Sequence, residues 1–242
     1  MALPFKISSR NLGEVLQFGF REGAHFLVDW VRREPPRAER ALEWVKQYAT
    51  PGDPDSVIAV LDEFGRSNRF LMNVGDRKGI LLDAEVAKAR PERAMELGAF
   101  CGYSAVRIAK QLREWDGKLT SIEISRKSVE VSTEMVALAG LAETVEFRQG
   151  SAAQVIPTLA GPYDLVFIDH WKDQYLPDLR CIEAHGLLVS GSVVVADNVG
   201  FFDASEYLVH VRESSLYDST HHESSLEYRD DLGDAVEVSV FR

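Results

Sequence analysis

Apolar positions at helical spacing dominate the first third of the chain. They predict a helix that begins at Pro36 and a second helix that runs from Asp53-Pro54 to Gly65. In the second helix, aspartate is expected to cap the first turn and proline to occupy the first helical position. A third helix is expected over about Gly79–Lys88, before Pro91. Residues 1–35 are expected to form a helical N-terminal extension that caps the domain formed by residues 36–242.

After residue 93 the pattern changes to short apolar runs that alternate with helical stretches. Such alternation is typical of a mostly parallel sheet covered on both faces. Two further alternating runs, 226–229 and 235–241, are joined around Gly233 and predict a terminal hairpin. We therefore expect an open, doubly wound α/β fold with a mostly parallel seven-stranded sheet. The five preceding strands are expected over Ala94–Leu97, Leu119–Glu123, Val145–Arg148, Leu165–Asp169 and Val193–Asp197.

Composition excludes several classes of function. The chain has 242 residues, with 38 acidic and 27 basic side chains and a formal charge of −11. This charge argues against binding to nucleic acid or to an anionic membrane surface. Two cysteines, Cys101 and Cys181, provide neither a disulfide framework nor a cysteine zinc site, and they suit a reducing compartment. No run reaches the roughly 18 apolar residues of a membrane span, so we expect a cytoplasmic protein of undetermined oligomeric state.

The first predicted chemical site follows the first strand of the alternating region. Gly98 and Gly102 flank the turn into the next helix, where a glycine allows the backbone to approach a ligand closely. Glu123 ends the next strand, where a carboxylate can accept hydrogen bonds from ribose hydroxyls. The G-x-x-x-G spacing differs from the G-x-G-x-x-G of dinucleotide-binding folds. Together these features favour a nucleoside-containing cofactor, and the glycine spacing is weak evidence that this cofactor is NAD.

The second predicted site lies beyond two later strands. Asp169 follows one strand, and Asp197 and Asn198 follow the next. A strand-end aspartate often only caps the following helix. Two aspartates and an amide at neighbouring strand ends, however, offer oxygen ligands that suit Mg²⁺, with room for two adjacent substrate hydroxyls. Lys172 is the candidate general base, because a nearby divalent cation would lower its pKa.

Four segments resemble the catechol O-methyltransferase family, within the cation-dependent O-methyltransferases. The similarity covers residues from about 38 to the end of the chain. The loop Asp169-His-Trp-Lys-Asp-Gln-Tyr-Leu-Pro-Asp178 is specific to that family, whereas many methyltransferases share the glycine turn. The other three segments are 72–79, 96–107 and 196–199.

The resemblance implies a class I, Rossmann-like methyltransferase that uses S-adenosylmethionine and Mg²⁺ to methylate a catechol. It implies Asp169, Asp197 and Asn198 as metal ligands and Lys172 as the base, with Glu227 as the partner of the second catechol hydroxyl. The cofactor site implied in this way comprises Met72, Val74, Glu96, Gly98, Tyr103, Ser104, Glu123, Ile124, Ser151, Asp169, His170 and Trp171. The implied substrate site comprises Phe70, Trp171, Lys172, Asn198, Phe202 and Glu227.

Three departures from the family pattern bear on substrate range and cofactor affinity. Phe70 replaces an aromatic gate that is usually tryptophan, and Phe202 falls near the usual proline wall. At the adenine contact the sequence is Gly150-Ser-Ala-Ala153, without the usual amide and hydroxyl. Alternative functions are a related enzyme for bulkier phenolic esters or flavonoids, an NAD-dependent oxidoreductase, and a binding module without chemistry.

Overall fold

The computed structural model describes residues 19–20, 22–23, 27–29, 31–67 and 70–242. The described positions between 19 and 32 are helical, residues 33–35 are not, and the remaining residues of the predicted N-terminal extension lie outside the described residues. Within the described part of the chain, no helix combines the length and apolar character needed to cross a bilayer.

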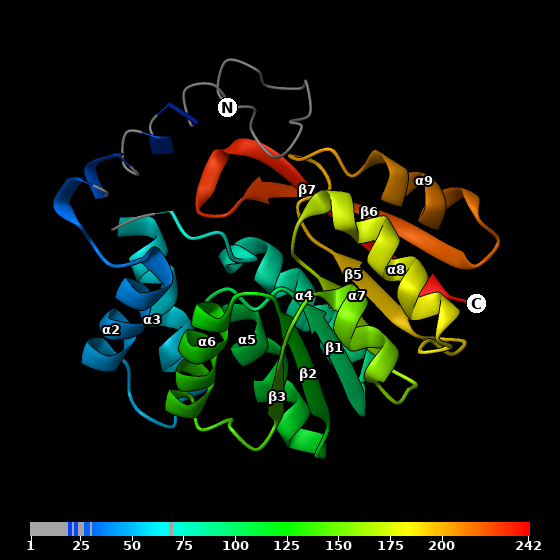
Figure 1. The fold of residues 1–242 in the computed structure, drawn as a ribbon, viewed down its shortest axis with the longest axis horizontal. Coiled ribbons are helices and arrows are strands. Elements are labelled where there is room, and N and C mark those ends of the chain that lie inside the picture. The colour runs from blue at the N-terminus through cyan, green and yellow to red at the C-terminus, as the bar shows by residue number, and fades with distance from the viewer. Residues whose placement is uncertain (1–18, 21, 24–26, 30, 68–69) are drawn as a thin grey trace.

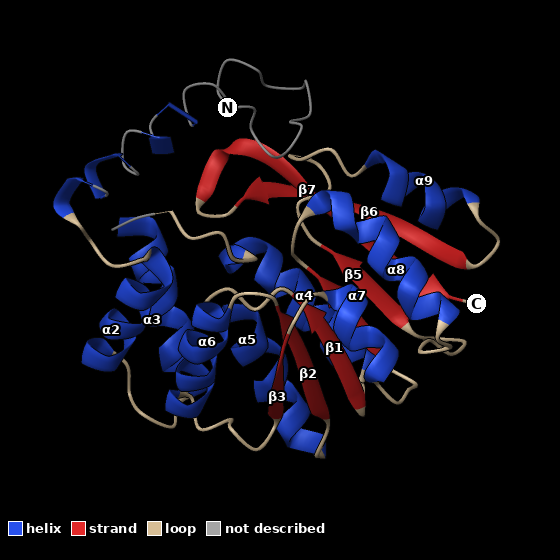
Figure 2. Ribbon diagram, viewed as in Figure 1, coloured by secondary structure: helices blue, strands red, loops and turns tan. Residues whose placement is uncertain are grey.

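A seven-stranded sheet forms the centre of the molecule (Figures 1 and 2). Its strand order is β3-β2-β1-β4-β5-β7-β6. The first five strands are parallel, and β7 lies antiparallel between β5 and β6. The order reverses between β1 and β4, which is where ligands bind in open α/β sheets. The expected doubly wound fold is confirmed, with strands β1 (Arg93–Leu97), β2 (Lys118–Glu123), β3 (Val145–Gln149), β4 (Leu165–Ile168), β5 (Val193–Ala196), β6 (Tyr217–Leu226) and β7 (Arg229–Phe241).

Helices cover both faces of the sheet (Figure 2). One buried cluster packs the five helices α2, α3, α4, α5 and α6 against one face of the sheet. A second cluster packs α7, α8 and α9 against the other face. Both faces of the central strands β4 and β5 are therefore buried, which explains why these strands are continuous apolar runs. The helices are α2 (Arg37–Tyr48), α3 (Pro54–Ser67), α4 (Gly75–Ala89), α5 (Tyr103–Leu112), α6 (Arg126–Leu138), α7 (Ala152–Val155), α8 (Tyr175–Ala184) and α9 (Ser205–Glu213).

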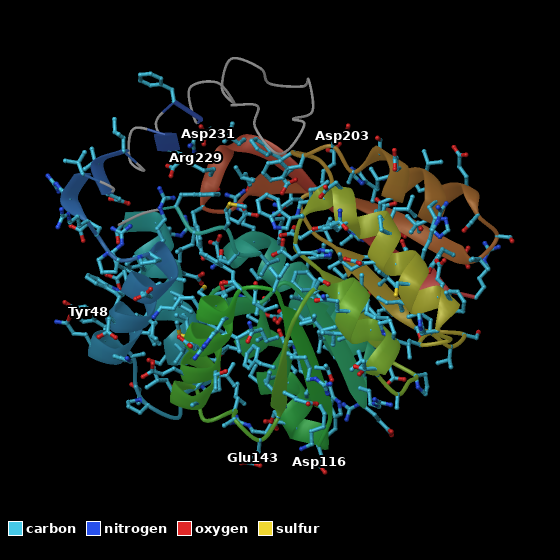
Figure 3. All side chains as sticks on the ribbon, viewed as in Figure 1. Tyr48, Asp116, Glu143, Asp203, Arg229 and Asp231 are labelled. Carbon is cyan, nitrogen blue, oxygen red and sulfur yellow. The ribbon has the colours of Figure 1, made fainter. Side chains whose placement is uncertain are left out.

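Opposite edges of the sheet can be told apart in Figure 3. Asp116 and Glu143, which precede β2 and β3, lie at the bottom of the view. Asp203, which follows β5, lies at the top together with Arg229 and Asp231 of the C-terminal hairpin. The carboxyl ends of the parallel strands and the hairpin loop therefore share one edge, and this edge carries the predicted site.

Three predicted boundaries are wrong. The second helix does not end at Gly65 but continues to Ser67. The third helix begins at Gly75 and not at Gly79. At this start the Asn73 side chain accepts a hydrogen bond from the Gly75 N–H at 3.1 Å. The hairpin turns at 227–228, whereas Gly233 lies inside β7 opposite Ser225.

Candidate active site

The aspartates that follow β4 and β5 lie at neighbouring strand tips. Ile168 pairs with Ala196 in parallel register, so Asp169 and Asp197 leave the sheet at the same edge. Asn198 has a φ of 54°, a left-handed conformation that asparagine tolerates better than most residues. Its backbone N–H donates to Asp197 Oδ1 at 2.8 Å. The strand ends therefore lie side by side, as the sequence predicts. The Asp197 side chain fixes the turn after β5 through its hydrogen bond with the Asn198 N–H.

Lys172 reaches this edge from the short 3₁₀ segment η4 (Lys172–Gln174). Its Nζ donates to Asn198 Oδ1 at 3.2 Å and lies 3.5 Å from Asp169 Oδ1. Its nitrogen is 5.8 Å from the centre of the Phe202 ring. The structure thus brings the predicted base next to two of the three predicted metal ligands and one predicted substrate contact.

A second lysine, Lys78 of α4, lies behind the strand tips. Its Nζ is 2.8 Å from Asp197 Oδ1, 2.5 Å from Glu227 Oε1 and 2.6 Å from Asp234 Oδ2. The Asn198 amide donates to the same oxygens of Glu227 and Asp234, at 2.6 and 2.8 Å. Glu227 is therefore a buried turn residue held by Lys78, and not an exposed strand residue paired with a surface cation.

Burial and ion pairing shift the pKa values of this cluster in opposite directions. Burial would lower the pKa of Lys78, but the carboxylates of Asp197, Glu227 and Asp234 together raise it well above its usual range. Burial raises the pKa of Asp197 well above its usual range and also raises that of Glu227, against the opposing charge of Lys78. The ammonium is the internal counter-ion of the cluster.

The oxygen atoms at this edge fit a hard divalent cation. Asp197 Oδ2 is buried without a hydrogen-bond partner among the described residues, so it has an unused acceptor. Carboxylate oxygens of Asp197, Glu227 and Asp234 lie within 4.8 Å of one another. However, the Lys78 ammonium already contacts all three of these residues. The unused Asp197 oxygen is therefore the observation that leaves a ligand position open.

The glycine turn lies against the end of β4. A Cβ at Gly98 would come within 2.3 Å of the Asp169 carbonyl oxygen, and Gly98 has a φ of 99°. The Glu123 carboxylate accepts the backbone N–H groups of Ala99 and Phe100, each at 3.1 Å. The structure therefore places Glu123, the expected ribose partner, directly beside the turn.

Several predicted cofactor residues have polar atoms or apolar surface without a partner. Glu96 Oε1 and His170 Nδ1 are buried and lack hydrogen-bond partners among the described residues. Burial raises the pKa of Glu96 to about 7, although hydrogen bonds with Ser104 and Ser121 oppose the rise. The apolar side chains of Met72, Ile124 and Trp171 are exposed by 58%, 63% and 53%. Unused polar atoms and exposed apolar groups fit an amphiphilic cofactor such as S-adenosylmethionine.

The remaining predicted cofactor residues occupy helix starts. Val74 is buried at the N-cap of α4, and Ser151 is the N-cap of α7. Gln154 accepts the Ser151 N–H at 3.3 Å, so a glutamine amide lies one residue beyond the position where the family pattern expects it. Tyr103 begins α5, but its hydroxyl donates to Asp62 Oδ1 at 2.7 Å and its side chain is part of the core.

The two phenylalanines predicted to contact substrate belong to one apolar cluster. Phe70 and Phe202 pack against the buried residues Phe201, Leu226 and Leu232. The cluster joins the segment after β5 to the hairpin turn that carries Glu227. The gate and wall positions of the family pattern thus form one apolar surface beside Lys172.

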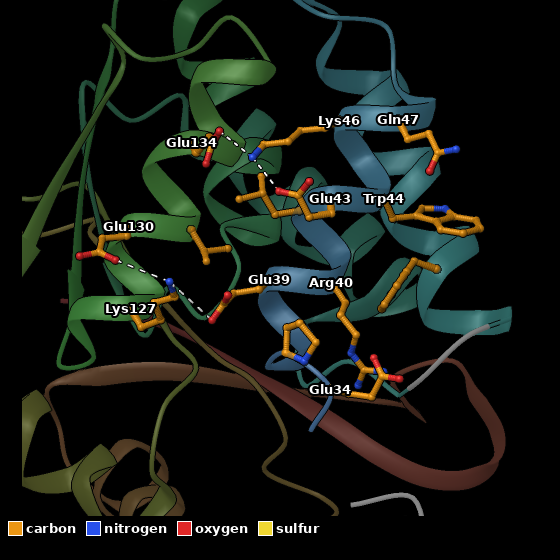
Figure 4. A pocket seen from close by; sticks show the side chains of 14 residues that line it. Glu34, Glu39, Arg40, Glu43, Trp44, Lys46, Gln47, Lys127, Glu130 and Glu134 are labelled. Carbon is orange, nitrogen blue, oxygen red and sulfur yellow. Dashed lines mark hydrogen bonds and ion pairs between the residues drawn. The ribbon is translucent and has the colours of Figure 1, made fainter. Parts of the chain in front are cut away.

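A separate groove of about 930 Å³ lies between α2 and α6, away from the strand tips (Figure 4). Ion pairs cross it: Lys46 to Glu134 at 2.8 Å, and Lys127 to Glu39 at 3.6 Å. These charges are paired with one another, and none of the predicted site residues lines the groove. It is therefore not the candidate active site.

Sequence reasoning missed three residues at the site. Lys78 lies in the recognised segment 72–79, where its position between two glycines gave no indication of burial. Asp234 follows Gly233, around which the sequence pattern predicts the hairpin turn. Tyr175 lies in the family-specific loop and contacts Lys172 Nζ at 2.5 Å.

Comparison with known proteins identifies the family. Residues 54–207 match the family model described as O-methyltransferase. The chain is 42% identical to catechol O-methyltransferase B of Danio rerio over 210 residues, which cover 85% of this chain and 79% of that protein. It is 38% identical to catechol O-methyltransferase of Mus musculus over 248 residues, which cover 100% of this chain and 93% of that protein.

Solved structures agree on the fold. The O-methyltransferase TomG from Streptomyces achromogenes, solved in complex with SAM, superposes with a TM-score of 0.66 at 24% identity. That match covers 86% of this chain and 99% of TomG. An O-methyltransferase from Bacillus cereus, solved in complex with SAH, gives a TM-score of 0.66 at 19% identity, covering 83% of this chain and 96% of that one. The family-model match and the identities to the two catechol O-methyltransferases show that the chain belongs to the O-methyltransferase family.

Proposed function

We propose that this O-methyltransferase transfers a methyl group from S-adenosylmethionine to one hydroxyl of a catechol, with Mg²⁺ as the required metal. The observation that carries the proposal is the position of Lys172 Nζ, between Asn198 Oδ1 and Asp169 Oδ1 at the carboxyl edge of the sheet. Similarity to the catechol O-methyltransferases of Danio rerio and Mus musculus supports the substrate class.

Asp169, Asp197 and Asn198 would hold the metal. The unused Oδ2 of Asp197 supports this assignment, as does the occupation of the alternative acidic trio by the Lys78 ammonium. When bound, Mg²⁺ supplies positive charge that lowers the pKa of a phenol and holds two vicinal oxygens.

Each remaining residue has a role set by its position. Lys172 takes the proton of the attacking hydroxyl at Nζ. Glu227 accepts a hydrogen bond from the other hydroxyl, while Phe70 and Phe202 orient the aromatic ring and exclude water. Orientation of this kind can contribute roughly 7–11 kcal/mol to lowering a barrier.

Turnover with S-adenosylmethionine and a catechol, with Mg²⁺ and with EDTA, tests the proposal. We expect one methylated product, no turnover in EDTA and recovery when Mg²⁺ is restored. A monophenol of the same size is the control, because it lacks the second oxygen and should not react. Equal turnover with and without metal would refute the metal assignment, and equal turnover of the monophenol would refute chelation of a catechol.

The apolar surface formed by Phe70 and Phe202 favours a second candidate, a related enzyme for bulkier phenolic esters or flavonoids. A panel that extends from simple catechols to catechol esters and flavonoids separates the two. Higher kcat/KM for simple catechols supports the first proposal, and higher kcat/KM for the bulky members supports the second. The oxidoreductase alternative does not apply to a member of this family.

A further inference from the structure

Tyr175 links Lys172 to the backbone of the strand tip. It is the first residue of α8 and its side chain is fully buried. Lys172 Nζ donates to its hydroxyl oxygen at 2.5 Å, and the hydroxyl donates to the Asp197 carbonyl oxygen at 3.0 Å. A single side chain therefore connects the proposed base to the strand end that carries two proposed metal ligands.

The direction of these hydrogen bonds determines what the phenol does for the lysine. Because its only proton is donated to the Asp197 carbonyl, the hydroxyl of Tyr175 acts as an acceptor toward Lys172. The Asn198 amide oxygen is the second acceptor, at 3.2 Å. Two N–H groups of the lysine are thus directed at fixed oxygens. The remaining polar neighbour of the nitrogen is Asp169 Oδ1, a proposed metal ligand at 3.5 Å, so the third position on the nitrogen lies toward the proposed metal site, where a substrate hydroxyl would bind.

The ring of Tyr175 has little freedom to move. It stacks on His170, with ring centres 5.3 Å apart and an angle of 17° between the planes, and meets the edge of Tyr207 at 5.7 Å. His170 Nε2 is itself 2.7 Å from Asp178 Oδ2, on the helix that Tyr175 begins. Lysine side chains have many accessible rotamers, so this rigid acceptor fixes a nitrogen that would otherwise be mobile.

We propose that Tyr175 is a positioning residue for methyl transfer, whose hydroxyl holds Lys172 Nζ in the orientation that accepts the substrate proton. This inference rests on the proposed role of Lys172 as the base. Tyr175 acts through Lys172 and does not itself need to touch the substrate.

Tyr175→Phe tests the inference, because the phenylalanine ring keeps both ring contacts and removes only the hydroxyl. We expect kcat to fall by about 10- to 100-fold, the scale of a small misplacement of a reacting group. The KM for catechol and the affinity for S-adenosylhomocysteine should stay within about twofold of wild type. Tyr207→Phe is the matched control. It is a neighbouring, fully buried tyrosine whose hydroxyl has no hydrogen-bond partner among the described residues, and phenylalanine keeps its ring contact with Tyr175, so its kcat should be unchanged.

A double-mutant cycle with Lys172→Met separates positioning from a general structural effect. If Tyr175 acts through Lys172, adding Tyr175→Phe to Lys172→Met should lower kcat no further. A full additional loss in the double variant would overturn the inference. A crystal structure of Tyr175→Phe gives a readout independent of turnover: we expect Lys172 Nζ to leave Asn198 Oδ1, and an unmoved Nζ would contradict the proposal.

The same experiments distinguish a failure of Lys172 as the proposed base from a failure of the proposed role of Tyr175. Wild-type turnover in Lys172→Met would refute Lys172 as the base and, with it, the proposed function of this side chain. Loss of turnover in Lys172→Met together with wild-type turnover in Tyr175→Phe would overturn only the role of Tyr175.

Discussion

Lys78 Nζ lies 2.8 Å from Asp197 Oδ1, and both side chains are almost completely excluded from solvent. Glu227 and Asp234 complete the surroundings of the same ammonium. The lysine comes from α4 and its partners from the end of β5 and from the hairpin, so one charge joins three distant segments. This cluster connects a proposed metal ligand to the proposed partner of the substrate hydroxyl.

Removing the ammonium should destabilise the protein. We expect Lys78→Met to lower the unfolding free energy by about 3–5 kcal/mol, because it leaves buried carboxylates without their counter-ion. Mg²⁺ should restore more stability in this variant than in wild type, since the vacated acidic cluster can then accept a cation. Urea denaturation with and without Mg²⁺ measures both effects. Lys88→Met is the control: it lies on the same helix, 71% of its side chain is exposed, and little change is expected.

The choice between the two oxygen clusters can be tested by paired substitutions. We expect Asp169→Asn to weaken Mg²⁺ binding by at least about 10-fold. Asp234→Asn should have a much smaller effect, because its carboxylate binds Lys78 and Asn198 in the proposed arrangement. Isothermal titration of each variant with Mg²⁺ gives the comparison. The opposite order would place the metal among Asp197, Glu227 and Asp234.

Glu96 should make stability depend on pH. Its pKa is raised by burial from an ordinary 4.5 to about 7, so between these values the folded protein binds more protons than the unfolded chain. The contribution of Glu96 is thus present below about pH 4.5 and is lost as the pH rises to 7, a difference of about 3 kcal/mol. Across this range, the stability of wild type should fall relative to that of Glu96→Gln in urea denaturation. Parallel pH curves for the two proteins would contradict the assignment.

Replacing Gly65 by alanine should destabilise the protein, although this substitution usually stabilises a helix. Replacing a helical glycine by alanine typically gains about 0.5–1 kcal/mol. At Gly65, however, the added Cβ would come within 2.4 Å of the Tyr228 ring, next to Glu227. We expect Gly65→Ala to be destabilised by about 1–3 kcal/mol and to bind catechol more weakly. Gly233→Ala is the control, since nothing lies within 4 Å of its added Cβ. Thermal unfolding and catechol KM check both variants, and equal behaviour would refute the clash.

The central strands β4 and β5 were predictable because every residue in them is buried, so each forms an unbroken apolar run. The observed ends of β4 and β5 differ by one residue from those expected, because Asp169 and Asp197 lie just beyond the last ladder pair. Their convergence followed from the topology alone, since adjacent parallel strands end at one edge.

The hairpin turn and Lys78 could not be predicted from local sequence. Leu226-Glu-Tyr-Arg229 alternates as a strand does, yet the chain turns at Glu227, which binds a lysine 149 residues away. A lysine on a helix is normally solvated. The burial of Lys78 depends on carboxylates from other segments of the chain, so it could not be predicted from the sequence of α4 alone.

The hairpin that carries Glu227 and contacts Phe70 and Phe202 is separate in sequence from the glycine turn and the strand ends on the cofactor side. Exchanging a few residues of this hairpin would therefore change the proposed substrate side of the site, while the residues proposed to recognise the methyl donor stay intact.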